Sequence, residues 1–290
     1  MKSDSHAFAA LAAEQILKGM GITSLPVDPI AIAQGRDIEV HAKPTTGGVS
    51  GMLIRVGNQF AIVYATHIDN DGFKHFCLAH ELGHYFLPGH PEALIAGDTG
   101  IHHSRAEFAS NDRYEMEADR FAAELLMPRY LFFPALERAG KGLAAIESLA
   151  TRCKTSLHAT AIRYTQCTRE PVAIVVSTGS RIDHCFMSEA LKGTSGIEWL
   201  RKREMVPSDT PTHTFNLDAE NVRRAARVED VSNLQQWFGG SRSAEISEDV
   251  VGLGSYGKTL TVLYDIDLPE AEDEEDEAAL IESWTPRFRK

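Results

Sequence analysis

The stretch FCLAHELGHYFLPGH, residues 76–90, holds three histidines and one glutamate among apolar neighbours. Residues 72–87 contain no proline and are typical of a mostly apolar helix that the following Pro-Gly pair ends. On such a helix His80 and His84 are four residues apart and share one face. Because two imidazoles on one face can bind the same ion, this stretch predicts a metal site on a helix.

Glu81 follows the first of these histidines and projects about 100° further round the helix. From there its carboxylate reaches a water on the metal more easily than the metal itself. His80 to His84 thus form the pattern H-E-x-x-H, which suits zinc and hydrolysis. Zinc lowers the pKa of a bound water from about 15.7 to about 7, and Glu81 can accept the proton and pass it to a leaving amine. The alternative is an accidental match in a core helix.

A catalytic zinc takes three protein ligands, and the third is open between two parts of the chain. His90 stands where the pattern H-E-x-x-H-x-x-G-x-x-H has its third histidine, although Leu87 replaces the glycine that makes the turn there. The second part is the predicted helix RYEMEADRFAAELLM, residues 113–127. We favour its Glu115 as the third ligand, with Glu117, which points to another face, as the fallback.

Other residues near these positions have candidate roles. Asp119 lies one turn after Glu115 and can accept the second N–H of a ligand histidine, which fixes the tautomer of that histidine. Peptide hydrolysis also needs a donor for the developing oxyanion, for which Tyr114, His102 and His103 are candidates. We expect Cys77 to be a buried core thiol.

The elements around the motif indicate an α+β protein. Helices are expected over residues 6–20 and in DPIAIAQG, and strands over 37–42, 50–57 and 59–65, with Gly57-Asn58 as a two-residue hairpin turn. Residues 88–111 are expected to form a loop. A structural helix pair is expected over 142–166. From residue 170 the sequence pattern predicts a strand, then a helix at WLRKRE and then a final pair of strands. This order of elements indicates a second α+β domain.

Composition restricts the partners. The net charge is −12, and seven of the negative charges lie within residues 270–277. A chain with this negative charge lacks the positive electrostatic potential that attracts the phosphates of nucleic acid. We therefore expect no direct DNA binding. No segment is long and apolar enough for a membrane span, no secretory signal opens the sequence, and the four cysteines form no C-x-x-C pair. We therefore expect a cytoplasmic protein.

Two of these sequence motifs together resemble a known protein family. AHELGH, followed some thirty residues later by E-x-E-A-D-x-F-A-A-E-L-L-M-P, is similar to the ImmA/IrrE family of bacterial metallopeptidases, and the likeness is strongest over residues 50–130. The resemblance implies a zincin-like domain with one zinc ion per chain, in which His80, His84 and Glu115 are ligands and Glu81 is the base. It also implies a peptidase that makes site-specific cuts in a helix-turn-helix transcriptional repressor and so relieves repression in a stress or mobile-element response.

The family layout implies a division of the chain into four parts. We expect a metallopeptidase domain over residues 1–130, a helical linker over 131–169, a sensor-like α+β domain over 170–268 and an acidic, disordered tail over 269–290. The competing hypothesis is a regulatory or binding module in which the metal is structural. Glu81 separates the two hypotheses, because a structural site has no use for a base.

Overall fold

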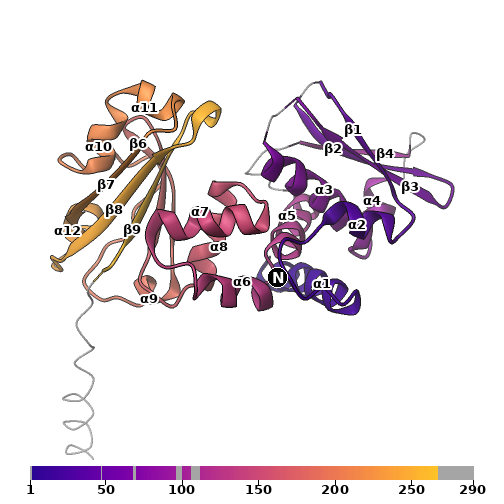
Figure 1. Cartoon of the computed structure of the whole chain (residues 1–290), viewed down its shortest axis with the longest axis horizontal. Helices are drawn as coiled ribbons and strands as arrows, with labels where there is room; N and C mark the ends of the chain where they lie inside the picture. The colour runs from indigo at the N-terminus through magenta and orange to yellow at the C-terminus, as the bar shows by residue number, and fades with distance from the viewer. Residues whose placement is uncertain (1, 47, 68–69, 96–99, 106–111, 267–290) are drawn as a thin grey trace, which may run out of the picture.

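The computed structural model describes residues 2–46, 48–67, 70–95, 100–105 and 112–266. Two β-sheets lie at opposite ends of the molecule, with helices between them (Figure 1). The mixed α+β composition predicted from the sequence is confirmed. The acidic tail falls outside the described residues. Within the described part of the chain, no helix combines the length and hydropathy that a membrane crossing requires.

The first half of the chain forms a four-stranded sheet and the helices that cover it. The sheet has the order β1-β3-β2-β4, with β1 parallel to β3 and the other neighbours antiparallel. The predicted hairpin turn at Gly57-Asn58 joins β2 to β3, in register Val56 opposite Gln59. The elements of this half are α1 (Lys2–Gly19), α2 (Pro29–Gln34), β1 (Glu39–Lys43), β2 (Val49–Val56), β3 (Gln59–Ala65), α3 (Asp71–Phe86), α4 (His90–Leu94), β4 (Ile101–Arg105) and α5 (Arg113–Leu126).

The region expected to be a loop, residues 88–111, contains a short helix and a strand, so that prediction was wrong in part. Gly89 immediately precedes α4, and its left-handed backbone conformation, with φ 82°, turns the chain into that helix. Strand β4 is five residues long, with the sequence IHHSR, and shows little of the β-branched composition that identifies strands. Its pairing with β2 therefore arises from tertiary contacts and not from local propensity.

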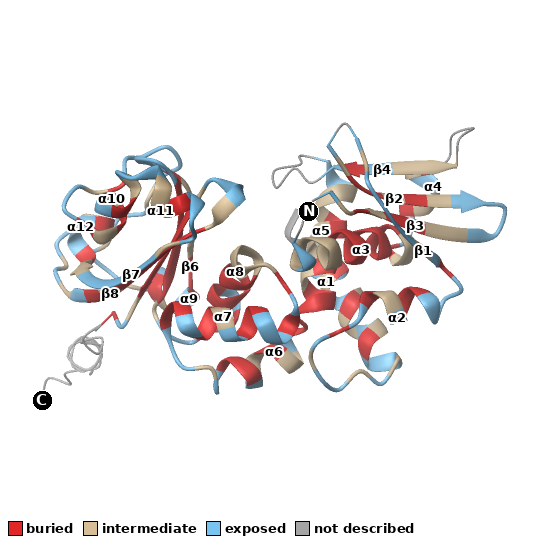
Figure 2. Cartoon of the chain, turned by 45° about the horizontal axis from the view of Figure 1, so that its top comes forward, coloured by how far each residue is buried: buried red, intermediate tan, exposed pale blue. Residues whose placement is uncertain are grey.

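Three helices connect the two sheets: α6 (Arg129–Leu136), α7 (Gly142–Cys153) and α8 (Leu157–Cys167). The last two form the predicted helix pair, and Lys154 in the left-handed region ends α7. Figure 2 shows buried residues running from α3 and α1 through α7 and α8 to the second sheet. One continuous core accordingly includes Leu82 of α3, Ile146 of α7 and Val262 of the second sheet.

The second sheet is antiparallel and has the order β6-β5-β9-β8-β7. One face packs on α7 and α8, and the other packs on a smaller core that includes Trp237 and Phe238. The elements are β5 (Ala173–Thr178), β6 (Arg181–Met187), α9 (Glu189–Lys192), α10 (Pro211–Asn216), α11 (Ala219–Arg223), β7 (Arg227–Asn233), α12 (Leu234–Phe238), β8 (Glu245–Gly252), a 3-10 turn (Gly254–Tyr256) and β9 (Thr259–Tyr264).

The helix predicted for WLRKRE, residues 199–204, does not form. Four charged residues in succession leave it no apolar face to bury, and Arg203 takes a left-handed φ of 75° that interrupts a helix. The segment instead runs along the end of β6, where Ile182 donates to the carbonyl of Glu204.

Candidate metal centre

Helix α3 is buried along its centre, from Cys77 to His84. It begins at Asn70, whose side chain accepts a hydrogen bond from the backbone N–H of Phe73, and it ends before Pro88. The helix lies between β2 and β3 on one side and α5 on the other, which explains why residues 77–84 are buried all round. His80 and His84 are therefore polar groups in the interior of the protein.

A glycine allows the second helix of the site to come close. A Cβ atom on Gly83 would lie 3.0 Å from the Cα atom of Ala118, so only glycine permits this approach of α3 to α5. Asp112 caps the N-terminus of helix α5, because its carboxylate accepts from the N–H groups of Tyr114 and Glu115. Glu115, one turn before Ala118, is thereby carried to the two histidines.

His80, His84 and Glu115 form one group whose potential ligand atoms all lie within 4.8 Å of one another. The Nε2 atoms of the two histidines are 3.0 Å apart. The Glu115 carboxylate oxygens lie 3.2 Å from His80 Nε2 and 3.4 Å from His84 Nε2. Two imidazole nitrogens and a carboxylate directed at one point are a donor set that suits zinc.

The protonation states of the group suit a positive charge at its centre. Burial on its own would lower the pKa of His80, but hydrogen bonds with Asp119 and Glu115 raise it to about 10, so an ion that binds here replaces a proton on His80. Burial on its own would raise the pKa of Glu115, but hydrogen bonds with His102, His80 and His84 lower it well below its usual range, so this carboxylate stays ionised. Burial lowers the pKa of His84 to about 3, which keeps that imidazole neutral, as a metal ligand must be. The group therefore offers a neutral histidine and a charged carboxylate in a desolvated position.

Asp119 and His102 extend the group on two sides. Asp119 Oδ1 lies 2.8 Å from His80 Nδ1, so it can accept the N–H of the nitrogen that points away from Glu115. His102 Nε2 lies 3.1 Å from Glu115 Oε1, and its ring meets the His84 ring edge-on. Strand β4 carries His102 on the face that looks toward α3, as its pairing with the buried Leu53 requires.

Glu81 lies beside the group and is fully buried. Neither of its carboxylate oxygens has a hydrogen-bond partner among the described residues. Burial raises the pKa of its carboxyl to about 7. Its carboxylate occupies a niche against β2 that Gly51 leaves open, since a Cβ there would lie 2.4 Å from Glu81 Oε1. An orphaned carboxylate of this kind fits a site that binds a metal and a water.

Several candidates from the sequence lie apart from the group. His90 and Glu117 pair with each other at 3.0 Å, on the far side of His84 from Glu115. The ring of Tyr114 packs against that of His90 and not against the ligand atoms. His103 is exposed and pairs with Met52 across the sheet, on the face opposite to His102.

Sequence reasoning missed Gly51 and Gly83. Gly51 interrupts a run of apolar strand residues, and a glycine within a strand is a known sign that another group approaches the backbone closely. Gly83 lies inside the H-E-x-x-H pattern, where its role depends on which helix packs opposite. A sequence does not specify that partner.

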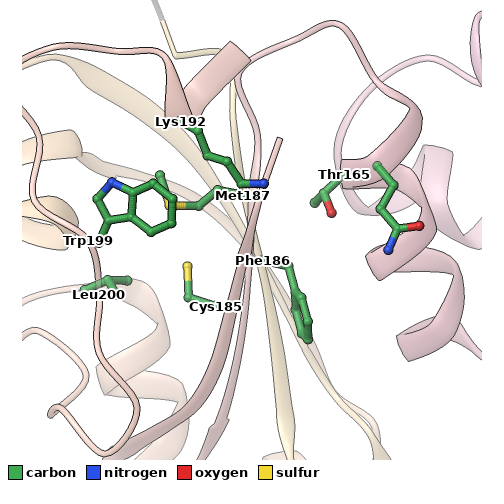
Figure 3. Close-up of a pocket in the computed structure, with 8 residues that line it drawn as sticks. Thr165, Cys185, Phe186, Met187, Lys192, Trp199 and Leu200 are labelled. Atoms are coloured by element: carbon green, nitrogen blue, oxygen red, sulfur yellow. The ribbon is translucent and has the colours of Figure 1, made fainter. Parts of the chain in front are cut away.

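A separate pocket of about 200 Å³ lies at the edge of β6 (Figure 3). Its walls include Cys185, Phe186 and Met187 of β6 and Trp199, with Lys192 at the rim. Burial raises the pKa of the Cys185 thiol to about 12, so this sulfur stays protonated and is a poor nucleophile. None of His80, His84 and Glu115 lines this pocket, so it is a separate feature from the metal-competent group on α3 and α5.

Comparisons with known proteins cover most of the chain. Residues 36–165 match the family model for the IrrE N-terminal-like domain, peptidase M78. No curated protein matches the chain. Among solved structures, the chain is similar to one described as a Mycobacterium tuberculosis transcriptional regulator, with 16% identity and a TM-score of 0.55. The match covers 89% of this chain and 76% of that one, and at this identity it shows the fold alone.

Proposed function

We propose that the chain is a zinc-dependent endopeptidase, and the match of residues 36–165 to the family model for the IrrE N-terminal-like domain, peptidase M78, supports this proposal. The observation that carries the proposal is the convergence of His80, His84 and Glu115 on one point, beside the orphaned carboxylate of Glu81. A structural metal site needs ligands alone and has no use for a base. Glu81 is the further group that hydrolysis requires.

The two histidines would hold the ion through Nε2 and Glu115 would hold it through its carboxylate. When bound, zinc supplies a Lewis acid that activates water and polarises a peptide carbonyl. Asp119 holds the His80 ring by accepting its Nδ1–H, which leaves Nε2 as the donor atom. The ionised Glu115 gives the site the negative charge that a divalent cation needs.

Glu81 acts as the general base and then as the general acid. Its carboxylate accepts a proton from the attacking water and passes it to the nitrogen of the departing amine. A carboxyl with a pKa near neutrality suits both tasks, because it gains and loses a proton with little driving force at cellular pH. The buried niche beside Gly51 fixes its position relative to the histidines.

The substrate peptide would lie along β4. Among the described residues this strand is at an end of the sheet order and pairs only with β2, so its outer backbone can take a further strand. A peptide added there runs past His102, which is the oxyanion-donor candidate nearest the group. Tyr114 and His103 are weaker candidates, because one packs on His90 and the other faces away.

The proposed substrate is a helix-turn-helix transcriptional repressor, whose cleavage relieves repression in a stress or mobile-element response. The proposal is supported by the similarity of AHELGH and of the Glu115 helix to the family. We propose the same layout as the family's: a zincin-like peptidase domain, a helical linker and a sensor-like C-terminal domain, acting in the cytoplasm. The net charge of −12 favours a protein substrate over DNA.

The test is incubation of the zinc-loaded protein with the purified repressor encoded beside it, with the fragments weighed by mass spectrometry. We expect one cut, lost on chelation. Glu81→Gln should bind zinc as the original does and cut about 10²- to 10⁴-fold more slowly. Cleavage by Glu81→Gln at the original rate would reject the base assignment. Zinc binding without cleavage of the repressor by the original protein would favour the regulatory-module hypothesis.

A further inference from the structure

A line of polar side chains runs from His84 to the protein surface, on the side away from Glu115. His84 Nδ1 lies 3.1 Å from His90 Nδ1, and His90 Nε2 lies 3.0 Å from Glu117 Oε2. The other oxygen of Glu117 accepts from Arg113 Nε at 2.6 Å. His84 and His90 have no exposed surface and Glu117 is 5% exposed, whereas Arg113 is on the outside.

The carboxylate at one end determines where each proton of this line lies. Glu117, ionised beside Arg113, can only accept hydrogen bonds, so His90 must carry its proton on Nε2. The Nδ1 atom of His90 is then a lone-pair acceptor. Only a proton on His84 Nδ1 can fill the 3.1 Å contact between the two rings. His84 Nε2 is left with a free lone pair, directed at His80 and Glu115.

We propose that His90, held by Glu117 and Arg113, is the positioning residue that fixes the tautomer and ring orientation of His84 for metal binding. This inference rests on the proposed function, since it takes His84 to be a ligand. The two ligand histidines would then have different hydrogen-bond partners at Nδ1. Asp119 supports His80 directly, whereas His84 is supported by a carboxylate one imidazole further away.

The local backbone brings His90 to this place. Helix α3 ends at Phe86, and Gly89, at φ 82°, turns the chain so that His90 begins α4 beside the helix it has just left. The backbone N–H of His90 donates to the carbonyl of Leu87, which secures the turn. The Tyr114 ring then packs edge-on against the His90 ring. His90 is thus a fixed part of the interior that cannot reach the Nε2 side of His84.

The experiment measures zinc affinity by competition with a chromogenic chelator at one fixed pH. His90→Leu removes the acceptor, and we expect zinc affinity to fall about 10- to 100-fold. His90→Asn keeps an oxygen acceptor near the position of Nδ1, so we expect affinity within about threefold of the original. A purely structural role would not separate these two variants in this order.

A matched pair on α5 provides the control. Glu117 and Glu124 are both 5% exposed, and Glu124 binds Arg163 at 2.7 Å in place of a histidine. Glu117→Gln, which can donate as well as accept, should weaken zinc binding about tenfold or more. Glu124→Gln removes an equally buried carboxylate from the same helix and should leave zinc affinity unchanged. Equal losses in both variants would show a general effect of helix damage and would overturn the proposal.

The original protein gives a readout that needs no variant. In histidine-labelled, zinc-loaded protein, two-bond nitrogen–proton spectra should show His84 protonated at Nδ1 and His90 protonated at Nε2. The opposite tautomer in either ring would overturn the proposal, even if His90→Leu failed to fold. Zinc affinity of His90→Leu equal to the original would refute the positioning role alone. Failure of the original protein to bind zinc would refute the proposed function as well.

Discussion

Among single residues, Glu81 destabilises the fold when its carboxyl is ionised. A fully buried carboxyl without a hydrogen-bond partner among the described residues destabilises the folded state when it ionises. Its pKa rises from an ordinary 4.5 to about 7, which corresponds to about 3 kcal/mol of lost stability once the group is charged. Such a cost is typical of a functional residue and unusual for a structural one.

This cost predicts a pH dependence of stability in the metal-free protein. The folded state binds more protons at Glu81 than the unfolded state between pH 4.5 and about 7, so stability falls as the pH rises through that window. Glu81→Gln does not titrate. We therefore expect the variant to gain up to about 3 kcal/mol relative to the original between pH 4.5 and pH 8. Urea unfolding at the two pH values measures the difference, and a difference that does not change with pH would contradict the burial argument.

Gly51→Ala tests the niche that holds the Glu81 carboxylate. The added Cβ would lie 2.4 Å from Oε1, and the carboxylate, as the end of a flexible side chain, would move away at little cost in stability. We expect peptide cleavage to slow about 10- to 100-fold, because a displacement of about 1 Å in a catalytic group is enough for this. Zinc affinity should stay unchanged.

The control for Gly51→Ala is Gly193→Ala, whose Cβ would meet nothing closer than 3.6 Å. It should alter neither cleavage nor zinc affinity. Cleavage by Gly51→Ala at the original rate would show that the Glu81 carboxylate does not depend on this niche.

At the scale of elements, the site depends on the close packing of α3 against α5. Gly83→Val would push the backbone of Ala118 away, at a cost of about 1–3 kcal/mol. Because Glu115 is one turn from Ala118, we also expect zinc affinity to fall. Gly19→Val is the control, since a Cβ at Gly19 has no neighbour within 4 Å. Thermal unfolding and chelator competition measure both effects, and an unchanged zinc affinity in Gly83→Val would contradict the assigned geometry.

The sequence predicted the elements whose signals are local. The Gly57-Asn58 turn marked an element boundary that the structure confirms, because a tight turn depends on neighbouring residues. Strand β4 was not predicted, since it depends on pairing with β2 across fifty residues. The spacing of His80 and His84 followed from helical geometry. The sequence did not decide the third ligand among His90, Glu115 and Glu117, because that depends on how α5 packs against α3. In the structure, Glu115 is the one of these three that lies with His80 and His84.

At the scale of the whole molecule, the helices between the sheets belong to one core. Residues 131–169, expected to be a linker, contribute Phe132, Leu149 and Tyr164 to the cluster that also contains Leu82 of α3. The buried pair of Arg163 and Glu124 ties α8 to the helix that carries Glu115, at 2.7 Å. The family match likewise extends to residue 165. The division of the chain at residues 130 and 170 stays a prediction.

A shared core predicts that the two ends of the molecule unfold together. Trp237 is buried in the second half, where its Nε1 donates to Glu248, and it becomes the only tryptophan in a Trp199→Phe, Trp284→Phe variant. In urea, with one equivalent of zinc, we expect the fluorescence change of Trp237 and the release of zinc to have the same midpoint. Zinc release that is complete before the fluorescence changes would indicate two independent domains.

His80, His84 and Glu115 are proposed to hold one ion next to Glu81. Anomalous diffraction at the zinc absorption edge, from crystals of the zinc-loaded protein, locates such an ion. We expect one strong peak per chain, about 2.0–2.2 Å from the Nε2 atoms of both histidines and from a Glu115 oxygen. A peak held by His90 and Glu117 instead, or no peak between α3 and α5, would contradict the proposal.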